Sequence, residues 1–391
     1  MSTDRANVLV VGGGIAGVGA ASFLAARADV TLVEREPTLA YHTTGRSAAL
    51  FFENYGAGPI RPLTRASRAY LENSSADAVD LPLLSRRGAL TIADERGLQR
   101  LEEVAEEGTA GGTVVERIDT SGAMGLCPVL RPEAVAAAIW EPEAADIDVA
   151  TLHQSFVRRL RTSGGAIRVG GELQTASHDG SHWTAHVGDA VWEGDVIVNA
   201  AGAWGDIIAE RCGVSPIGLT PMRRTAFMVA GHEAWKQWPL VVEVDHRFYF
   251  KPDGVQLLCS LAEENPCEPC DARPEEVDVA RAIERINAAT TLDIRHVRSA
   301  WTGLRTFASD RAMVIGPDPD QAAFVWLVGQ GGTGIQTAPA ASRLAAALAL
   351  GDPVPEDIAE AGLDPDSLSA RRFRTAAGAR GGEPDVRTAT T

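Results

Sequence analysis

The chain has 391 residues, 45% of them hydrophobic and 23% charged, with a formal net charge of −16 and a sequence pI of about 5.0. Such an acidic chain is a poor match for nucleic acid or an anionic membrane, because both bind clustered Lys and Arg. No window reaches the ~18 consecutive apolar residues of a membrane-spanning helix, and five cysteines predict no disulfide framework, so we expect a cytoplasmic protein.

The first predicted element is a buried parallel strand at Val8–Val11, apolar on both faces. Gly12, Gly14 and Gly17 follow it with the spacing G-x-G-x-x-G. The first glycine permits a tight turn, the second lets a pyrophosphate approach the backbone, and the third lets the next helix pack against the strand. The apolar run is too short for a secretory signal, so we expect no signal peptide.

A helix over 15–28 and a second strand at 30–33 continue this pattern. The helix N-terminus would direct its amides and the positive end of its dipole toward phosphates. The second strand ends at Glu34, where dinucleotide-binding folds carry the carboxylate that binds ribose hydroxyls. The whole arrangement predicts a dinucleotide-binding domain, whereas the glycines alone would indicate only a tight turn.

The loop at 40–56 is rich in small and hydroxylated residues, namely Thr43, Thr44, Gly45, Arg46 and Ser47. The glycine fingerprint does not distinguish NAD from FAD. This loop suits a chain that runs along a pyrophosphate and a ring system. The alternative interpretation is a polar surface loop.

The middle of the chain alternates between predicted helices and short strands. We predict helices at 57–83, 95–112, 148–165 and 275–290, and strand-rich segments at 88–94, 166–204 and 220–261. A strand at 324–328, a glycine loop at 329–334 and a helix at 335–350 then repeat the opening unit. A cofactor held by both ends of the chain implies a discontinuous domain.

Five motifs in the same order resemble the D-amino acid oxidase/glycine oxidase superfamily of FAD flavoproteins. They are the opening glycine turn with Glu34, HTTGRSAA at 42–49, VNAAGAW at 198–204, GLRTF with a following Asp at 303–310, and GQGGTGIQT at 329–337. Within this family the chain most resembles the bacterial D-arginine dehydrogenases, up to about residue 372. The resemblance implies noncovalent FAD rather than NAD, and an α/β fold in which a Rossmann-like FAD-binding domain is interleaved with a mainly antiparallel-β substrate-binding domain with helices.

The domain boundaries follow from the same resemblance. The expected FAD-binding domain is discontinuous and comprises residues 1–84, 149–215 and 300–374. The expected substrate-binding domain comprises 85–148 and 216–299. The remaining stretch, 375–391, has no hydrophobic pattern and is predicted to be a disordered tail.

The resemblance also implies the residues that contact FAD. These are Gly12, Gly14, Ile15, Ala16, Glu34, Arg35, Thr44, Gly45, Arg46, Ser47, Ala48, Leu173, Ala201, Gly202, Trp204, Gly303, Gly331, Gly332, Thr333, Gly334, Ile335 and Gln336. Some relatives attach FAD covalently through a His in the 42–49 loop, which makes His42 a possible tether. Because the resemblance is to proteins that bind FAD noncovalently, we expect no tether.

Substrate contacts are implied at Tyr55, Arg224, Tyr249, Arg305 and the backbone of Gly332. Two arginines and two tyrosines suit a carboxylate, because arginine forks bind it bidentately and phenol hydroxyls donate to it. Neighbours along a strand point to opposite sides, so one of Arg223 and Arg224 must face away, and the resemblance favours Arg224 for the site. By residue type alone, Arg305 would equally suit a surface ion pair.

Three residues depart from the dehydrogenase pattern. Ala89 stands where those enzymes have the acid that meets the substrate guanidinium, and Leu50 and Phe52 replace polar residues of the same pocket. We therefore expect neutral, apolar D-amino acids to be better substrates than D-Arg. Glu53 is the nearest acid in sequence that could still serve a basic substrate if it turned inward.

Two further patterns were interpreted as carrying no chemistry. Cys267 and Cys270 form a C-x-x-C, but there is no second pair and no adjacent His, which favours a plain loop. His178, His182 and His186 would share a face only in a helix, and their surroundings predict strands around a turn. We therefore expect no metal site.

The expected activity is oxidation of a D-amino acid by hydride transfer from its α-carbon to the flavin. The imino acid product hydrolyses to a 2-oxo acid and ammonia, and no acid–base residue is required if the amine binds neutral. Alternatives in the same fold are an oxidase of N-methyl or cyclic amino acids and a 2-hydroxy acid dehydrogenase. An alternative of another class is a non-catalytic flavin-binding module. The expected partner is a small amino acid; the electron acceptor and the oligomeric state are left open.

Overall fold

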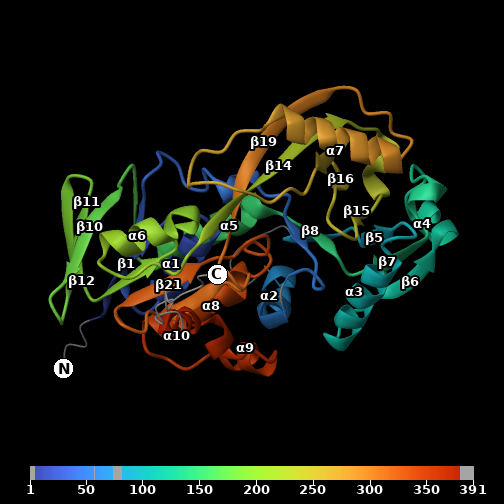
Figure 1. The fold of residues 1–391 in the computed structure, drawn as a ribbon. Coiled ribbons are helices and arrows are strands. Elements are labelled where there is room, and N and C mark those ends of the chain that lie inside the picture. The colour runs from blue at the N-terminus through green and yellow to red at the C-terminus, as the bar shows by residue number, and fades with distance from the viewer. Residues whose placement is uncertain (1–4, 57, 74–81, 379–391) are drawn as a thin grey trace, which may run out of the picture.

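The computed structural model describes residues 5–56, 58–73 and 82–378. Two sheets of different kinds dominate it (Figure 1). The β1, β21, α1 and α8 elements lie toward one end of the molecule, and β14, β15, β16 and α7 lie toward the other. The long strands β14 and β19 extend between the two ends (Figure 1).

The first sheet has six strands in the order β20-β21-β13-β1-β2-β9. Their bounds are β1 Asn7–Val11, β2 Asp29–Glu34, β9 Ala166–Val169, β13 Val196–Asn199, β20 Val314–Pro317 and β21 Phe324–Val328. All neighbours are parallel except β20 and β21. The strands come from three distant parts of the chain, so the sheet is discontinuous in sequence.

Both faces of this sheet are covered, which explains why β1 is apolar throughout. Val8 and Val10 face a core shared with α1 (Ile15–Leu24), α5 (Val149–Thr162) and α8 (Ala338–Ala349). Leu9 and Val11 face a second core. That second core is completed by α6 (Gly205–Arg211) and by the small sheet β10 (Leu173–His178), β11 (Trp183–Val187) and β12 (Ala190–Gly194).

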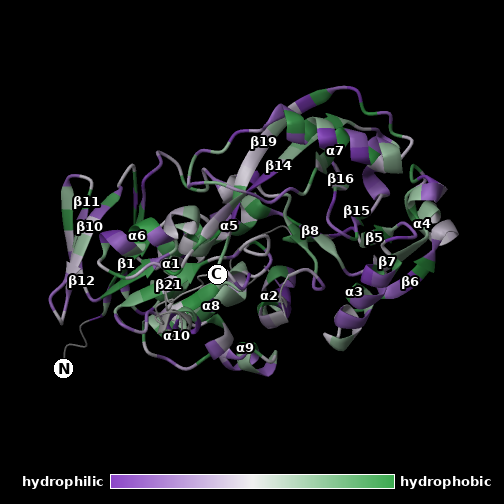
Figure 2. Ribbon diagram, viewed as in Figure 1, coloured by the Kyte–Doolittle hydropathy of each residue, from purple (hydrophilic) through white to green (hydrophobic). Residues whose placement is uncertain are grey.

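The second sheet has nine strands, in the order β18-β14-β17-β16-β15-β5-β7-β6 with β19 paired to β14. The bounds are β5 Ala89–Ala93, β6 Glu116–Asp119, β7 Ala137–Glu141, β14 Thr220–Ala230, β15 Leu240–Glu243, β16 Tyr249–Asp253, β17 Gln256–Ser260, β18 Asn265–Pro266 and β19 Val297–Phe307. Only β15 and β5 pair in parallel. Helices α3 (Leu98–Ala110), α4 (Thr120–Leu126) and α7 (Glu276–Ala289) pack on it, and their polar faces appear purple in Figure 2.

The remaining elements connect or flank the two sheets. They are β3 (Leu50–Phe51), β4 (Leu84–Arg86) and β8 (Ala145–Ile147), which form a third small sheet, together with α2 (Arg61–Glu72), α9 (Glu356–Glu360) and α10 (Arg371–Gly378). In the described part of the chain, none of the helices is both long and apolar enough to span a membrane. Within the same residues, no group of three or more His, Cys, Asp and Glu could hold a metal ion.

The expected mixed α/β fold, with one mainly parallel and one mainly antiparallel large sheet, is confirmed. Three details differ. The boundary placed at residue 300 falls inside β19, which belongs by pairing to the large sheet. Helix α2 is shorter than the predicted 57–83, of which residues 57 and 74–81 lie outside the described residues. Helix α10 includes residues 375–378, so the first four residues of the predicted tail are helical, and 379–391 are not described.

Candidate active site

A pocket lies where the carboxyl ends of β1, β2 and β13 meet strands β14, β16 and β19. Its lining therefore combines residues of both large sheets. One end is formed by the glycine turn after β1 and by Glu34, and the other by Arg224, Tyr249 and Arg305. A ligand that fills this pocket would touch both parts of the molecule.

The glycine turn after β1 has no room for side chains. Gly12 has a φ of +114°, and a Cβ there would lie 2.5 Å from the Ala200 carbonyl oxygen. A Cβ at Gly17 would lie 1.9 Å from the Gly12 carbonyl oxygen. The turn therefore brings bare backbone and the N-terminus of α1 to the pocket, which is the cradle that a pyrophosphate fits.

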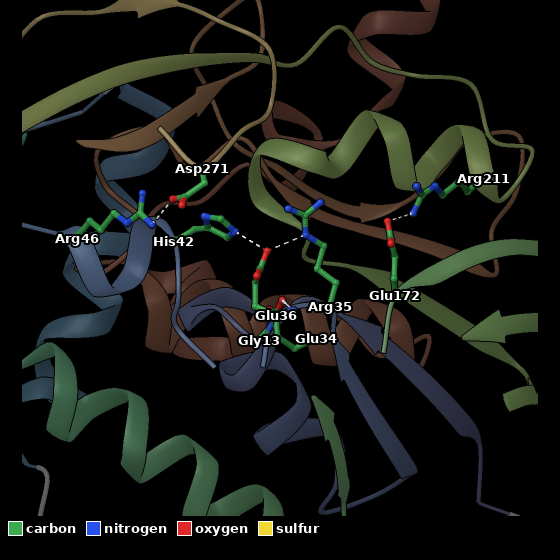
Figure 3. Close-up of polar contacts among 9 residues, drawn as sticks. All are labelled: Gly13, Glu34, Arg35, Glu36, His42, Arg46, Glu172, Arg211 and Asp271. Atoms are coloured by element: carbon green, nitrogen blue, oxygen red, sulfur yellow. Dashed lines mark hydrogen bonds and ion pairs between the residues drawn. The ribbon is translucent and has the colours of Figure 1, made fainter. Parts of the chain in front are cut away.

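The carboxylate of Glu34 is held in place by backbone amides. One oxygen accepts from the Gly13 N–H at 2.7 Å and the other from the Glu36 N–H at 2.8 Å. Figure 3 shows Glu34 beside Gly13, and the side chain also lines the pocket. A carboxylate has about four lone-pair sites, so it retains acceptors for a ribose.

Next to Glu34, charged and aromatic side chains surround this end of the pocket. His42 Nε2 and Arg35 Nε each lie 3.0 Å from the same Glu36 oxygen (Figure 3). The hydrogen bond from His42, together with Arg35, lowers the pKa of Glu36 despite the opposing effect of burial. The Trp204 ring contacts both side chains, with its centre 4.3 Å from the Arg35 guanidinium carbon and 4.7 Å from the His42 ring centre.

Most residues expected to contact FAD line the pocket. Those that line it are Gly12, Gly14, Ile15, Ala16, Glu34, Arg35, Thr44, Arg46, Ser47, Ala48, Leu173, Ala201, Gly202, Trp204, Gly303, Gly331, Gly332, Gly334 and Ile335. Gly45, Thr333 and Gln336 are not among the lining residues. Gln336 is buried behind the 52–55 segment, where it accepts from the Phe52 N–H and donates to the Tyr55 carbonyl.

At the opposite end, two arginines approach the same space. Arg305 Nη1 donates to the Tyr55 hydroxyl at 2.9 Å. Arg224 is 9% exposed, and burial together with the positive charge of Arg305 lowers its pKa. A Cβ on Gly332 would lie 2.4 Å from the Tyr55 hydroxyl oxygen, so this glycine leaves room for the phenol.

The alternation along β14 separates the neighbouring arginines. Arg224 lines the pocket, whereas Arg223 donates to the Arg273 carbonyl and pairs with Glu275 at 2.7 Å. Arg224 is held from behind, because its Nε donates to the Glu263 carbonyl at 2.8 Å and its Nη2 lies 3.1 Å from Glu264. Glu263 and Glu264 belong to no recognisable sequence motif, so nothing in the sequence marks them for this role.

The residues that depart from the dehydrogenase pattern gather beside this end. Ala89, Leu50 and Phe52 share an apolar cluster with Tyr249, although Tyr249 alone of the four lines the pocket. Phe52 stacks on Tyr55 with ring centres 6.1 Å apart. Tyr55 itself is outside the lining and reaches the site through its bond to Arg305.

Glu53 points away from this cluster and pairs with Arg68 at 2.8 Å. His246, in contrast, was not selected from the sequence, because a lone His in a loop carries no signal. Its ring lies edge-on to Tyr55 with centres 6.0 Å apart. Desolvation by the surrounding protein lowers the pKa of His246, and the positive charges of Arg224 and Arg305 lower it further.

Comparisons with known proteins agree with this geometry. Residues 7–348 match the family model described as DAO, FAD dependent oxidoreductase. The bovine FAD-dependent oxidoreductase domain-containing protein 1 (Bos taurus) is 27% identical over 408 residues, which cover 89% of this chain and 82% of that protein.

Two solved structures show the same fold. Glycine oxidase from Geobacillus kaustophilus superposes with a TM-score of 0.81 and 21% identity, over 93% of this chain and 99% of that chain. L-proline dehydrogenase from P. horikoshii superposes with a TM-score of 0.84 and 18% identity, over 95% and 99%.

The chain therefore belongs to the DAO family of FAD-dependent oxidoreductases. Its cofactor is FAD, and the residues around the pocket fit this group. The glycine turn after β1 has room for a pyrophosphate, and the anchored carboxylate of Glu34 would be an acceptor for the ribose hydroxyls.

Proposed function

We propose that this enzyme oxidises neutral, apolar D-amino acids, and that Arg224, Arg305 and Tyr55 bind the substrate carboxylate. The observation that carries this proposal is the convergence of two guanidinium groups on one pocket beside an apolar cluster. Two positive charges in a partly enclosed space attract an anion, and planar guanidinium groups bind a carboxylate with defined geometry.

FAD, when bound, supplies the acceptor for the hydride that leaves the substrate α-carbon. The role of the protein is to hold that carbon in position. Arg305 is oriented by the Tyr55 hydroxyl and Arg224 by the Glu263 carbonyl and Glu264. Fixing the carboxylate at both arginines restricts the rotation of the substrate before reaction. We assign no acid–base residue, because a substrate amine that binds neutral need not lose a proton before the hydride leaves the α-carbon.

The preference for apolar side chains is supported by Ala89, Leu50 and Phe52. A cationic side chain placed against this cluster would lose its hydration without gaining a partner. Glu53 cannot serve as the partner of a cationic substrate side chain, because it already pairs with Arg68. An apolar side chain would gain about 25 cal/mol for each Å² that it buries there.

A second candidate is the oxidation of secondary amines, that is, N-methyl or cyclic amino acids. It is favoured by the similarity to an L-proline dehydrogenase, whose named substrate is a cyclic amino acid. The carboxylate-binding residues would serve such substrates equally well. The two candidates differ in the amine and in the size of the side chain.

The test is a kcat/KM series with an artificial electron acceptor. D-Leu, D-Phe, D-Met, D-Arg and D-Lys are compared with their L-enantiomers, proline and N-methylglycine. The highest kcat/KM for an apolar D-amino acid supports the proposal, and the highest for proline or N-methylglycine supports the second candidate. If D-Arg has the highest kcat/KM, the proposed preference for apolar side chains is wrong. Failure of all these substrates to bleach the flavin under anaerobic conditions would favour a non-catalytic flavin-binding module.

A further inference from the structure

Cys267 and Cys270 lie on the segment 267–275, between β18 and α7. Cys270 is exposed and Cys267 is partly buried, and their side chains share a hydrogen bond. The three other cysteines of the chain are all buried. These two thiols lie in a loop, as expected from the sequence, and they differ from the other three in being adjacent to each other and at least partly accessible to solvent.

The same segment contacts the FAD pocket. Cys267 packs in a small apolar cluster with Ala203, Trp204 and Leu304, three residues that line the pocket. Just after Cys270, Asp271 accepts from Arg46 Nη2 at 2.5 Å, as Figure 3 shows. The next carbonyl, of Ala272, lies 3.2 Å from Arg46 Nη1. The segment therefore holds the guanidinium of Arg46, which lines the pocket.

We propose that Cys267 and Cys270 form a reversible disulfide, with hydrogen peroxide as the oxidant, and that this bond loosens FAD by displacing Asp271 from Arg46. The inference uses the FAD binding of the family and does not depend on the identity of the substrate.

The chemistry takes place in two steps. The exposed Cys270 thiol releases its proton, and its sulfur attacks one oxygen of hydrogen peroxide. The O–O bond breaks, the sulfur becomes a sulfenic acid, and the departing hydroxide takes up the released proton to form one water. The Cys267 sulfur then attacks the Cys270 sulfur, forms the S–S bond and displaces the second water. In total, two thiols and one peroxide give a disulfide and two waters. A dithiol reductant reverses the oxidation by thiol–disulfide exchange.

Disulfide formation would affect FAD binding because only one of the two cysteines, Cys270, is free to move. Cys267 is fixed by its packing and by its N–H, which donates to the Pro221 carbonyl at 3.0 Å. An S–S bond is about 2.05 Å long, much shorter than a thiol–thiol hydrogen bond. Closing it must therefore draw Cys270 toward Cys267, and Asp271 is the next residue in the chain. Because Cys270 and Asp271 are both exposed, they can move without disturbing the hydrophobic cores of the protein.

The first test is mass spectrometry of the intact FAD-bound protein after titration with hydrogen peroxide. We expect a loss of about 2 Da, mapped to a peptide linking Cys267 and Cys270, and its recovery with dithiothreitol. Cys267→Ser and Cys270→Ser should each abolish the loss. Oxidation of Cys270 to a sulfinic acid in the wild type without a disulfide, or no reaction at either thiol, would overturn the proposal.

The second test measures the rate at which free, fluorescent FAD appears after dilution of the holoenzyme. We expect release to be about two- to fivefold faster from the oxidised protein, the size of effect of a partly exposed ion pair. Asp271→Asn should show the faster release in both redox states. Asp352→Asn, which removes an exposed partner of Arg27 elsewhere, is the control and should retain the redox response.

Equal release from the oxidised and reduced wild type would refute the coupling, as would a persistent redox response in Asp271→Asn. Neither measurement requires turnover. Both therefore remain informative if the proposed amino acid substrates prove wrong.

Discussion

At the scale of single residues, Glu34 is the candidate for binding the FAD ribose, because its anchored carboxylate lines the pocket. We predict that Glu34→Ala weakens FAD binding by roughly 1.5–3 kcal/mol, because the ribose loses a charged acceptor. The measurement is a titration of the apoprotein with FAD, with circular dichroism as the control for folding. Glu34→Gln retains one acceptor oxygen and should bind FAD with intermediate affinity. An unchanged affinity in Glu34→Ala would show that the ribose is bound elsewhere.

Arg305 tests the carboxylate-binding role. Arg305→Ala should lower kcat/KM by on the order of 2–5 kcal/mol in transition-state free energy, because the substrate carboxylate loses a paired charge in a partly enclosed site. Arg223→Ala is the matched control, since Arg223 lies on the adjacent strand and faces away from the pocket. If both variants lose the same amount, the effect is not specific to the carboxylate site.

Glu141 is a buried carboxyl whose titration should be visible in stability. Burial raises its pKa to about 8, with Glu53 adding to the effect and Asn54 opposing it. The folded protein therefore retains a proton that the unfolded chain releases near pH 4.5, so this group destabilises the fold progressively as the pH rises from about 5 to 8. Glu141→Gln should flatten that part of the profile of Tm against pH. A parallel decline in both proteins would contradict the assignment.

At the scale of elements, the close packing of α1 on α8 depends on Gly19. A Cβ there would lie 2.1 Å from Ser342 Oγ, a buried hydroxyl with no hydrogen-bond partner in the part of the chain that the structure describes. Gly19→Ala should lower stability by about 1–3 kcal/mol through overpacking, although alanine is the better helix former. Thermal unfolding of the single and double variants measures the effect.

Ser342→Ala is the second variant, and together with Gly19→Ala and the double variant it forms a double-mutant cycle. Removing the hydroxyl opens the space that the Gly19→Ala methyl needs and deletes a buried polar atom. The double variant should therefore be more stable than Gly19→Ala alone. If the two substitutions lower the free energy of unfolding additively, the Gly19→Ala methyl group does not clash with the Ser342 side chain, and the helices have moved apart instead.

At the scale of the whole molecule, the pocket is built from both large sheets, so FAD should stabilise the protein as one unit. Added FAD at about 100 times its Kd should contribute about 2.7 kcal/mol. We expect Tm to rise with FAD concentration in a single transition, and heat or acid to release intact FAD. Colour that remains with the precipitated protein would instead indicate a covalent bond, for which His42 is the candidate.

Local patterns in the sequence were sufficient for the cofactor half of the protein. The strand Val8–Val11, the glycine turn and Glu34 lie within one short stretch, and their spacing alone dictates a turn against a helix N-terminus. The parallel sheet and its interruption by other segments followed from a second such unit near the end of the chain. These features are local, so neighbouring residues suffice to specify them.

The arrangement of the arginine-lined end of the pocket is set by packing between segments that are distant in sequence. Arg224 faces the pocket and Arg223 does not because of the register of β14 against β19, which the sequence cannot specify. Glu53 turns to Arg68, Gln336 supports the segment that carries Tyr55, and Asp271 reaches Arg46 across 225 positions in sequence. These contacts join residues far apart in the chain, and their partners are set by packing rather than by any local pattern. For the same reason, the contact of the C-x-x-C loop with residues that line the pocket is visible only in the folded structure.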